Sequence, residues 1–158
     1  MMFASRQMLA EERPGAGASG RPRSLSSQTE ATLRRAVDVV LVAGQNVLVV
    51  GQDELLDRWG RQFAAAMRAR SDVQLEIYIP ASAESLVSRF NHALASLSLE
   101  AARGEIASGL ASKVLLVPDL RSLDTPEGML LCRLVSDFPG ANTRLVLLAD
   151  RDGLARAG

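Results

Sequence analysis

The residues best placed to do chemistry in this sequence each follow a short apolar run. Gly51 follows residues 46–50, Asp119 follows an apolar run that ends at Pro118, and Asp150 follows residues 144–149. If the runs are parallel strands, these residues lie at the carboxyl edge of one sheet, where α/β proteins bind ligands. A glycine before a helix lets a phosphate approach the backbone, and aspartates hold magnesium. Any ligand site is therefore expected at this edge.

The loop that begins at Gly51 lacks the groups that hold a phosphate. A working loop reads G-x-x-x-x-G-K-[ST], in which the lysine reaches the outer phosphates and the hydroxyl holds magnesium. Counted from Gly51, the second glycine is replaced by Leu56, the lysine by Asp57 and the hydroxyl residue by Arg58. We expect Asp53 to cap the following helix, where its carboxylate repels a phosphate. The loop is therefore predicted not to grip a nucleotide.

The acidic residues after the later runs form an incomplete set. A working nucleotidase strand ends in Asp, which serves magnesium, followed by Glu, which orients water. If Asp119 is the metal ligand, Leu120 replaces the glutamate; if Asp119 takes the glutamate place, Pro118 replaces the metal ligand. The alternative interpretation is that Asp119 and Asp150 are ordinary loop and cap residues. We expect no catalytic residue and no metal site.

Other reactive side chains are scarce. His92 is the one histidine and Cys132 the one cysteine, so neither a multi-histidine metal site nor a disulfide within the chain can form. We interpret His92 as a helix-surface or partly buried residue and Cys132 as a small buried apolar one.

Charge and aromatic content indicate no nucleic-acid partner. The formal net charge is zero and aromatic residues make up 4% of the chain, which leaves no basic field and no stacking platform. Arg58, Arg61, Arg68 and Arg70 lie on one predicted helix and are interpreted as its solvated face.

Helical and strand patterns alternate along the chain. Helices are expected from a cap at Thr29 to Gly44, over 53–70, from a cap at Ser82 to 97, over a short stretch within 102–110, and from a cap at Thr125 to just before 137. Strands are expected over 46–50, 73–79, 114–117 and 144–149. This alternation predicts a three-layer αβα fold with a mostly parallel sheet of about four to five strands.

Two segments carry more detailed expectations. The core side of the helix over 53–70 is predicted to consist of Leu55, Trp59, Phe63 and Met67. In the strand over 73–79, the odd-numbered Val73, Leu75, Ile77 and Ile79 are expected to face inward and Gln74, Glu76 and Tyr78 outward.

Composition divides the chain into three parts. Residues 1–27 contain a run of small, polar and helix-breaking residues and are expected to form a disordered arm. Residues 28–154 are expected to form one α/β domain, and residues 155–158 a terminal tail.

The order of elements resembles the core of P-loop ATPases, in particular the AAA-type ATPases of the ExeA general-secretion group. The resemblance spans Thr29 to Gly153 and rests on residues 44–51, on 77–86, on 113–120 as the Walker B strand and on 144–150 as the sensor strand. It implies a P-loop-like core in which Gly51, Asp57 and Arg58 are vestigial phosphate-loop positions, Asp119 is a vestigial Walker B residue and Asp150 a vestigial sensor. It also implies a lid over the nucleotide, for which we expect no counterpart in this sequence.

A receiver domain of response regulators is the rival resemblance. Residues 47–56 look like the opening of such a domain, with 114–119 as the strand that bears the phosphoacceptor. However, Gly51 and Gln52 replace its acidic pair, and the segment between the second and third strands is long enough for two helices.

In both resemblances, the residues that carry the family's chemistry are replaced at the expected site. We therefore expect a pseudo-ATPase, a non-enzymatic module without a cofactor that acts in protein–protein interaction, scaffolding or regulation. The alternatives are a degenerate receiver-like dimerisation or localisation domain and an atypical nucleotide hydrolase that draws cations from Arg58, Arg61 or a neighbouring subunit.

Partners and location follow from the same resemblance. The ExeA group implies bacterial secretion, pilus or envelope machinery as partner, and self-association is a further expectation. The sequence has no secretory signal at its start and no run of about 18 apolar residues, so we expect a cytoplasmic protein without a membrane span.

Overall fold

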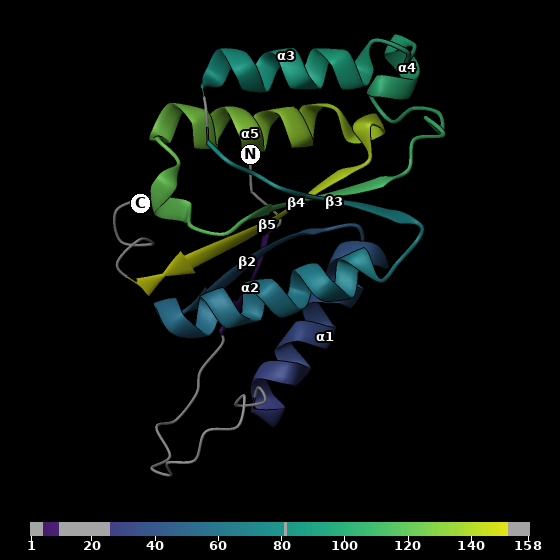
Figure 1. Ribbon diagram of the computed structural model, residues 1–158. Coiled ribbons are helices and arrows are strands. Elements are labelled where there is room, and N and C mark those ends of the chain that lie inside the picture. Colours follow the sequence, from purple (N-terminus) through teal and green to yellow (C-terminus); the bar gives the residue numbers. More distant parts are fainter. Residues whose placement is uncertain (1–4, 10–25, 81, 152–158) are drawn as a thin grey trace.

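In the part of the chain that the structure describes, five parallel strands form a central sheet with helices on both faces (Figure 1). This computed structural model describes residues 5–9, 26–80 and 82–151. The strands are β1 (Ser5–Leu9), β2 (Asn46–Gly51), β3 (Val73–Ile77), β4 (Ser112–Val117) and β5 (Thr143–Asp150). They lie in the order β1-β2-β5-β4-β3, and every neighbouring pair is parallel. The predicted three-layer αβα architecture is confirmed.

The helices divide between the two faces of the sheet. They are α1 (Ser27–Leu41), α2 (Asp53–Arg68), α3 (Ala83–Leu94), α4 (Leu99–Ala102) and α5 (Thr125–Asp137), with the 3₁₀ turns η1 (Leu120–Ser122) and η2 (Pro139–Ala141). Figure 1 shows α1 and α2 on one face and α3 and α5 on the other. Each face therefore has its own apolar core.

The prediction for the N-terminal arm is wrong at two places. Ser5–Leu9 form β1, which pairs with β2 in the register Ser5 to Asn46 and so hydrogen-bonds at the edge of the sheet. The pairing satisfies backbone groups, a benefit that local composition does not reveal. Helix α1 also starts at Ser27, with Ser26 rather than Thr29 as its cap. The other arm residues, 1–4 and 10–25, and the expected tail 155–158 lie outside the described residues.

The strand order separates the two resemblances. A receiver-like, flavodoxin-type sheet has the order 2-1-3-4-5, which would place β3 beside β2. Here β5 lies beside β2, and β3 is at the far edge next to β4. Two helices, α3 and α4, connect β3 to β4. Both features contradict the receiver interpretation, whereas the arrangement is consistent with a P-loop-like core.

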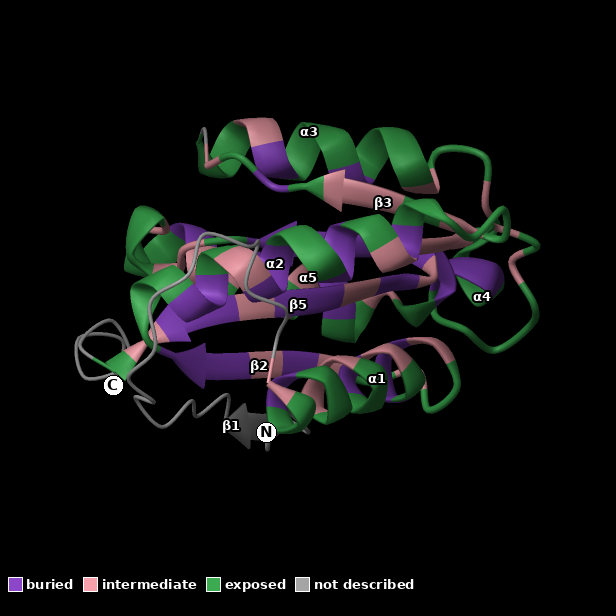
Figure 2. Ribbon diagram, turned by 60° about the horizontal axis from the view of Figure 1, so that its bottom comes forward, coloured by how far each residue is buried: buried purple, intermediate pink, exposed green. Residues whose placement is uncertain are grey.

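The predicted core side of α2 is confirmed. Leu55, Trp59, Phe63 and Met67 are all buried, and the rings of Trp59 and Phe63 stack with centroids 5.1 Å apart. They pack against β2, β4 and β5 together with residues of α1. Figure 2 shows the buried surface concentrated on β2, β5 and the sheet-facing side of α2.

The strand predicted over 73–79 ends earlier, since β3 stops at Ile77, and its inward and outward assignment is wrong for the last residues. Tyr78, expected outside, is 2% exposed, whereas Ile77 and Ile79 are 41% and 75% exposed. Because helices cover both faces of the sheet, alternate residues on either face can be buried. Tyr78 packs into the core beneath α3 and α5, while Val73 and Leu75 pack toward α2.

Two helix boundaries also differ from the expectation. Helix α5 is capped by Asp124, one residue earlier than expected, since its Oδ1 accepts a hydrogen bond from Glu127 N at 2.7 Å. The short helix α4 ends at Ala102, before Gly104 at φ +76°, instead of continuing toward Leu110. The left-handed backbone at Gly104 stops the helix there.

Candidate functional site at the carboxyl edge of the sheet

Arg121 lies at the carboxyl edge of the sheet and contacts three aspartates. Its Nε and Nη2 lie 3.0 and 3.2 Å from the two carboxylate oxygens of Asp119. Its Nη1 lies 2.9 Å from Asp150 Oδ2, and its Nη2 lies 3.4 Å from Asp53 Oδ1. One guanidinium therefore joins the ends of β4 and β5 to the start of α2. We call these four residues the Arg121 cluster.

Local backbone structure places the parts of this cluster. Asp119 begins the 3₁₀ turn after β4, and its Oδ1 accepts a hydrogen bond from Arg121 N at 2.9 Å. Ser122 Oγ donates to the carbonyl oxygen of Asp119 at 2.6 Å, which tightens the same turn. Asp150 is positioned by the sheet register, because it pairs with Gly51 at the end of β2. The turn thus directs Arg121 toward the aspartates of neighbouring elements.

Electrostatics favour the charged states of Asp119 and Arg121. The hydrogen bond with Arg121 is the main reason that the pKa of Asp119 lies below its usual value. The pKa of Arg121 is raised, first by Asp119 and then by Asp150 and Asp53. Arg121 and Asp119 have side chains that are 39% and 43% exposed, whereas Asp150 is only 12% exposed. Solvent therefore screens the cluster in part, and the Asp150 contact is its most protected member.

The structure brings together some of the predicted site residues and separates others. Gly51, Asp119 and Asp150 meet at this edge, as predicted for the ends of parallel strands. Asp57, at the lysine position, instead pairs with Arg61 Nη2 at 2.7 Å along the exposed side of α2. Arg58 is half-buried on α2 and is not among the described residues that line the cleft here.

The predicted capping role of Asp53 is wrong. Gln52 is the N-cap of α2, without a capping hydrogen bond from its side chain, and Asp53 is the first helical residue. The carboxylate of Asp53 contacts Arg121 instead. Asp53 and Glu54 nevertheless both lie in the first turn, so two acids interact there with the positive end of the helix dipole. The expected negative field at the phosphate position is present for a different geometric reason.

A cleft of about 660 Å³ lies beside the cluster, between α2 and the ends of β3, β4 and β5. Four aspartates and three arginines line it: Asp53, Asp57, Asp119, Asp150, Arg61, Arg68 and Arg121. Among the described residues, no three His, Cys, Asp or Glu side chains are grouped so as to hold a metal ion. The single positive charge of Arg121 pairs with three aspartates, so the cluster keeps an excess of negative charge. The arrangement therefore suits an internal charge network better than phosphate binding.

Arg121 is not among the site residues predicted from the sequence. The available signal is an arginine two residues after Asp119, the aspartate that follows β4, a spacing that permits a local ion pair. The partners Asp53 and Asp150 lie 68 and 29 residues away in sequence, so only the fold brings them into contact.

The isolated reactive residues lie away from this edge. His92 is exposed on α3, in agreement with its interpretation as a helix-surface residue. Cys132 is half-buried on α5, where burial raises the pKa of its thiol. In the part of the chain that the structure describes, no helix has the length and apolar character needed to cross a membrane.

Comparison of the chain with models of protein families, with curated proteins and with solved structures finds no match.

Proposed function

We propose that this domain is a catalytically inactive, ATPase-like module that acts by binding other proteins within a larger assembly. The partner class that the ExeA resemblance suggests is secretion, pilus or envelope machinery. Self-association is a second mode of the same proposal.

The Arg121 cluster is the observation that carries this proposal. In the resemblance, Asp119 stands for the magnesium ligand and Asp150 for the sensor, and both contact the guanidinium of Arg121. A magnesium–nucleotide complex would have to displace this cation and then meet Asp53 and Asp57, where a P-loop offers N–H groups and a lysine. The retained aspartates thus support the fold by pairing with arginine.

An atypical nucleotide hydrolase is the competing function. It would need Asp119 free to hold magnesium, because positioned cations provide most of phosphoryl-transfer catalysis. The bidentate contact of Asp119 with Arg121 argues against that role.

A nucleotide titration distinguishes the two functions. The full chain is titrated with a fluorescent ATP analogue in the presence of magnesium, and released phosphate is measured in parallel with ATP. We expect no saturable binding below about 1 mM, which corresponds to about 4 kcal/mol of binding free energy. Micromolar affinity, or phosphate release that disappears in Asp119→Ala, would overturn the proposal.

The edge strand β3 supports the protein-binding part of the proposal. Among the described strands β3 pairs only with β4, and Ile77 and the nearby Ile79 are 41% and 75% exposed. Exposed apolar side chains beside an open strand edge favour association with another chain. We therefore expect Ile79→Lys to reduce self-association or the capture of a purified partner at least tenfold. Ile106→Lys is the control, because Ile106 is 58% exposed in the connection between α4 and β4.

A further inference from the structure

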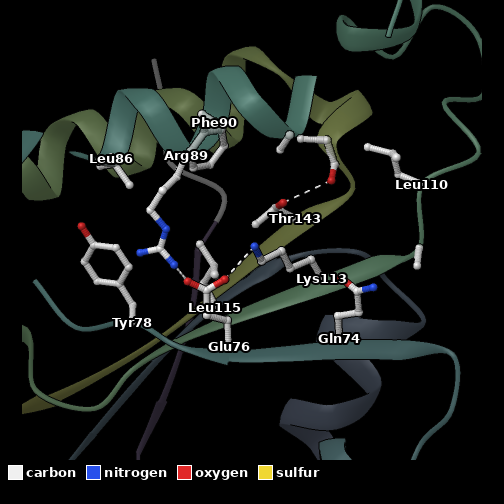
Figure 3. A pocket seen from close by; sticks show the side chains of 13 residues that line it. Gln74, Glu76, Tyr78, Leu86, Arg89, Phe90, Leu110, Lys113, Leu115 and Thr143 are labelled. Atoms are coloured by element: carbon white, nitrogen blue, oxygen red, sulfur yellow. Dashed lines mark hydrogen bonds and ion pairs between the residues drawn. The ribbon is translucent and has the colours of Figure 1, made fainter. Parts of the chain in front are cut away.

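A second cavity lies on the other face of the sheet, between α3 and the strands β3 and β4 (Figure 3). Its volume is about 220 Å³. The apolar part of its lining includes Tyr78, Leu86, Phe90, Leu110 and Leu115. Leu86 and Phe90 come from α3, while Tyr78 and Leu115 come from the strand side. The cavity shares no lining residue with the cleft at the Arg121 cluster.

Three charged side chains stand together in this otherwise mostly apolar lining. Glu76 lies between Arg89 of α3 and Lys113 of β4, as Figure 3 shows. One carboxylate oxygen of Glu76 contacts Arg89, and the other lies 2.7 Å from Lys113 Nζ. These are the charged residues among those that line the cavity, so its formal charge is one positive unit.

The positive charges are close and partly desolvated. The pKa of Lys113 lies below its usual value, first because of burial and then because of repulsion from Arg89. Arg89 also lies over the ring of Tyr78, with its guanidinium carbon 5.6 Å from the ring centroid. An ammonium has three N–H donors, and the contact with Glu76 uses one. An additional anion at this place would offset the repulsion and accept hydrogen bonds from both cations.

We propose that this cavity binds a small organic monoanion with an apolar body, such as a medium-chain or aromatic carboxylate. Its carboxylate would contact Lys113 and Arg89, and its apolar part would lie against Leu86, Phe90 and Leu115. The size fits: a cavity of about 150 Å³ holds benzene, so this one accommodates a ligand of roughly ten non-hydrogen atoms. A nucleotide is too large and too highly charged for it. This ligand site is independent of the pseudo-ATPase proposal.

Octanoate is the probe for the test, with octan-1-ol and octylammonium as neutral and cationic counterparts. Binding to the full chain is followed by the backbone amide NMR signals of β3 and β4. We expect saturable shifts confined to these strands and α3, with octanoate at least tenfold tighter than either counterpart. Equal affinity for octan-1-ol, or shifts that do not saturate, would overturn the proposal.

Substitutions of opposite sign test the charge argument. Lys113→Gln removes the excess positive charge and is expected to weaken octanoate binding at least tenfold, whereas Lys113→Arg retains it. Glu76→Gln raises the formal charge by one unit and is expected to tighten binding. Arg68→Gln, on the opposite face of the sheet, is the matched control and should leave affinity unchanged. Unchanged affinity in both the Lys113→Gln and Glu76→Gln variants contradicts the inference, and thermal melts check that each variant is folded.

Discussion

Replacing Arg121 with methionine tests the structural role of the Arg121 cluster most directly. The substitution keeps an unbranched side chain of similar length and removes the guanidinium. Asp53, Asp119 and Asp150 then face one another without the cation that joins them. The ends of β4, β5 and α2 lose their shared contact, and their carboxylates repel.

The expected cost follows from distance and exposure. The three ion pairs have closest contacts of 3.4, 3.0 and 2.9 Å, but the Arg121 side chain is 39% exposed. Exposed pairs contribute about 0.2–1 kcal/mol each, and contacts that share one group do not add fully. We therefore expect Arg121→Met to lower the free energy of unfolding by about 1–2 kcal/mol at neutral pH and low salt. That loss corresponds to a decrease in Tm of about 2–8 °C.

The effect must depend on pH in a defined direction. Arg121 lowers the pKa of Asp119 in the folded state, so its stabilisation is present above the unfolded value, about 3.9. It is lost as the pH falls through the lowered folded value. The difference in unfolding free energy between wild type and Arg121→Met should therefore be largest near neutral pH. It should shrink as the pH falls below about 4.

Urea unfolding at several pH values measures this difference. Arg61→Met is the matched control: Arg61 forms an ion pair with Asp57 on the same helix, both side chains are exposed, and a cost of about 0.3–0.5 kcal/mol is expected. If Arg121→Met costs no more unfolding free energy than Arg61→Met, or if its cost does not change with pH, Arg121 does not have the stabilising role assigned to it.

Two further perturbations test the packing and the buried polar pair. Gly140→Ala should lower the free energy of unfolding in urea by about 1–3 kcal/mol or more, because its Cβ would lie 1.7 Å from the carbonyl oxygen of Ala101. Gly128→Ala is the control in α5: nothing lies within 4 Å of its Cβ position, so this substitution should stabilise the protein. The hydroxyl of Tyr78 donates a hydrogen bond to Glu127 at 2.6 Å. The pKa of Tyr78 is raised, mainly because the side chain is buried and next because of this hydrogen bond. The one tyrosine should therefore show no phenolate absorbance at pH 10 until the chain is unfolded, and folded stability should fall as the pH rises above about 10; ionisation of the folded protein at pH 10 would contradict this.

Local sequence patterns predict the buried side and the cap of a helix correctly where only one side of that helix is buried. Residues Leu55, Trp59, Phe63 and Met67 recur every four positions and are all buried. Ser82 caps α3 as predicted, since its Oγ accepts a hydrogen bond from Ser85 N at 3.1 Å. Such signals involve residues within one or two helical turns, so the sequence contains all the partners.

The pattern failed where burial depends on what covers each face. Tyr78 and Ile77 exchange their expected environments because β3 lies between helices on both faces and at an open edge. The strand β1 was missed because its stabilising partner, β2, begins 37 residues after the end of β1. Neither result could follow from alternation within a short segment.

Local patterns in the sequence are enough to predict an α/β protein in which Gly51, Asp119 and Asp150 lie at the ends of strands. The sequence also shows that Asp57 and Arg58 replace the lysine and hydroxyl of a phosphate loop. The position of β5 between β2 and β4, and the contacts of Arg121 with three aspartates of separate elements, become visible in the folded chain. Strand order and long-range ion pairs depend on which segments meet in space, and the same apolar patterns are compatible with many such arrangements.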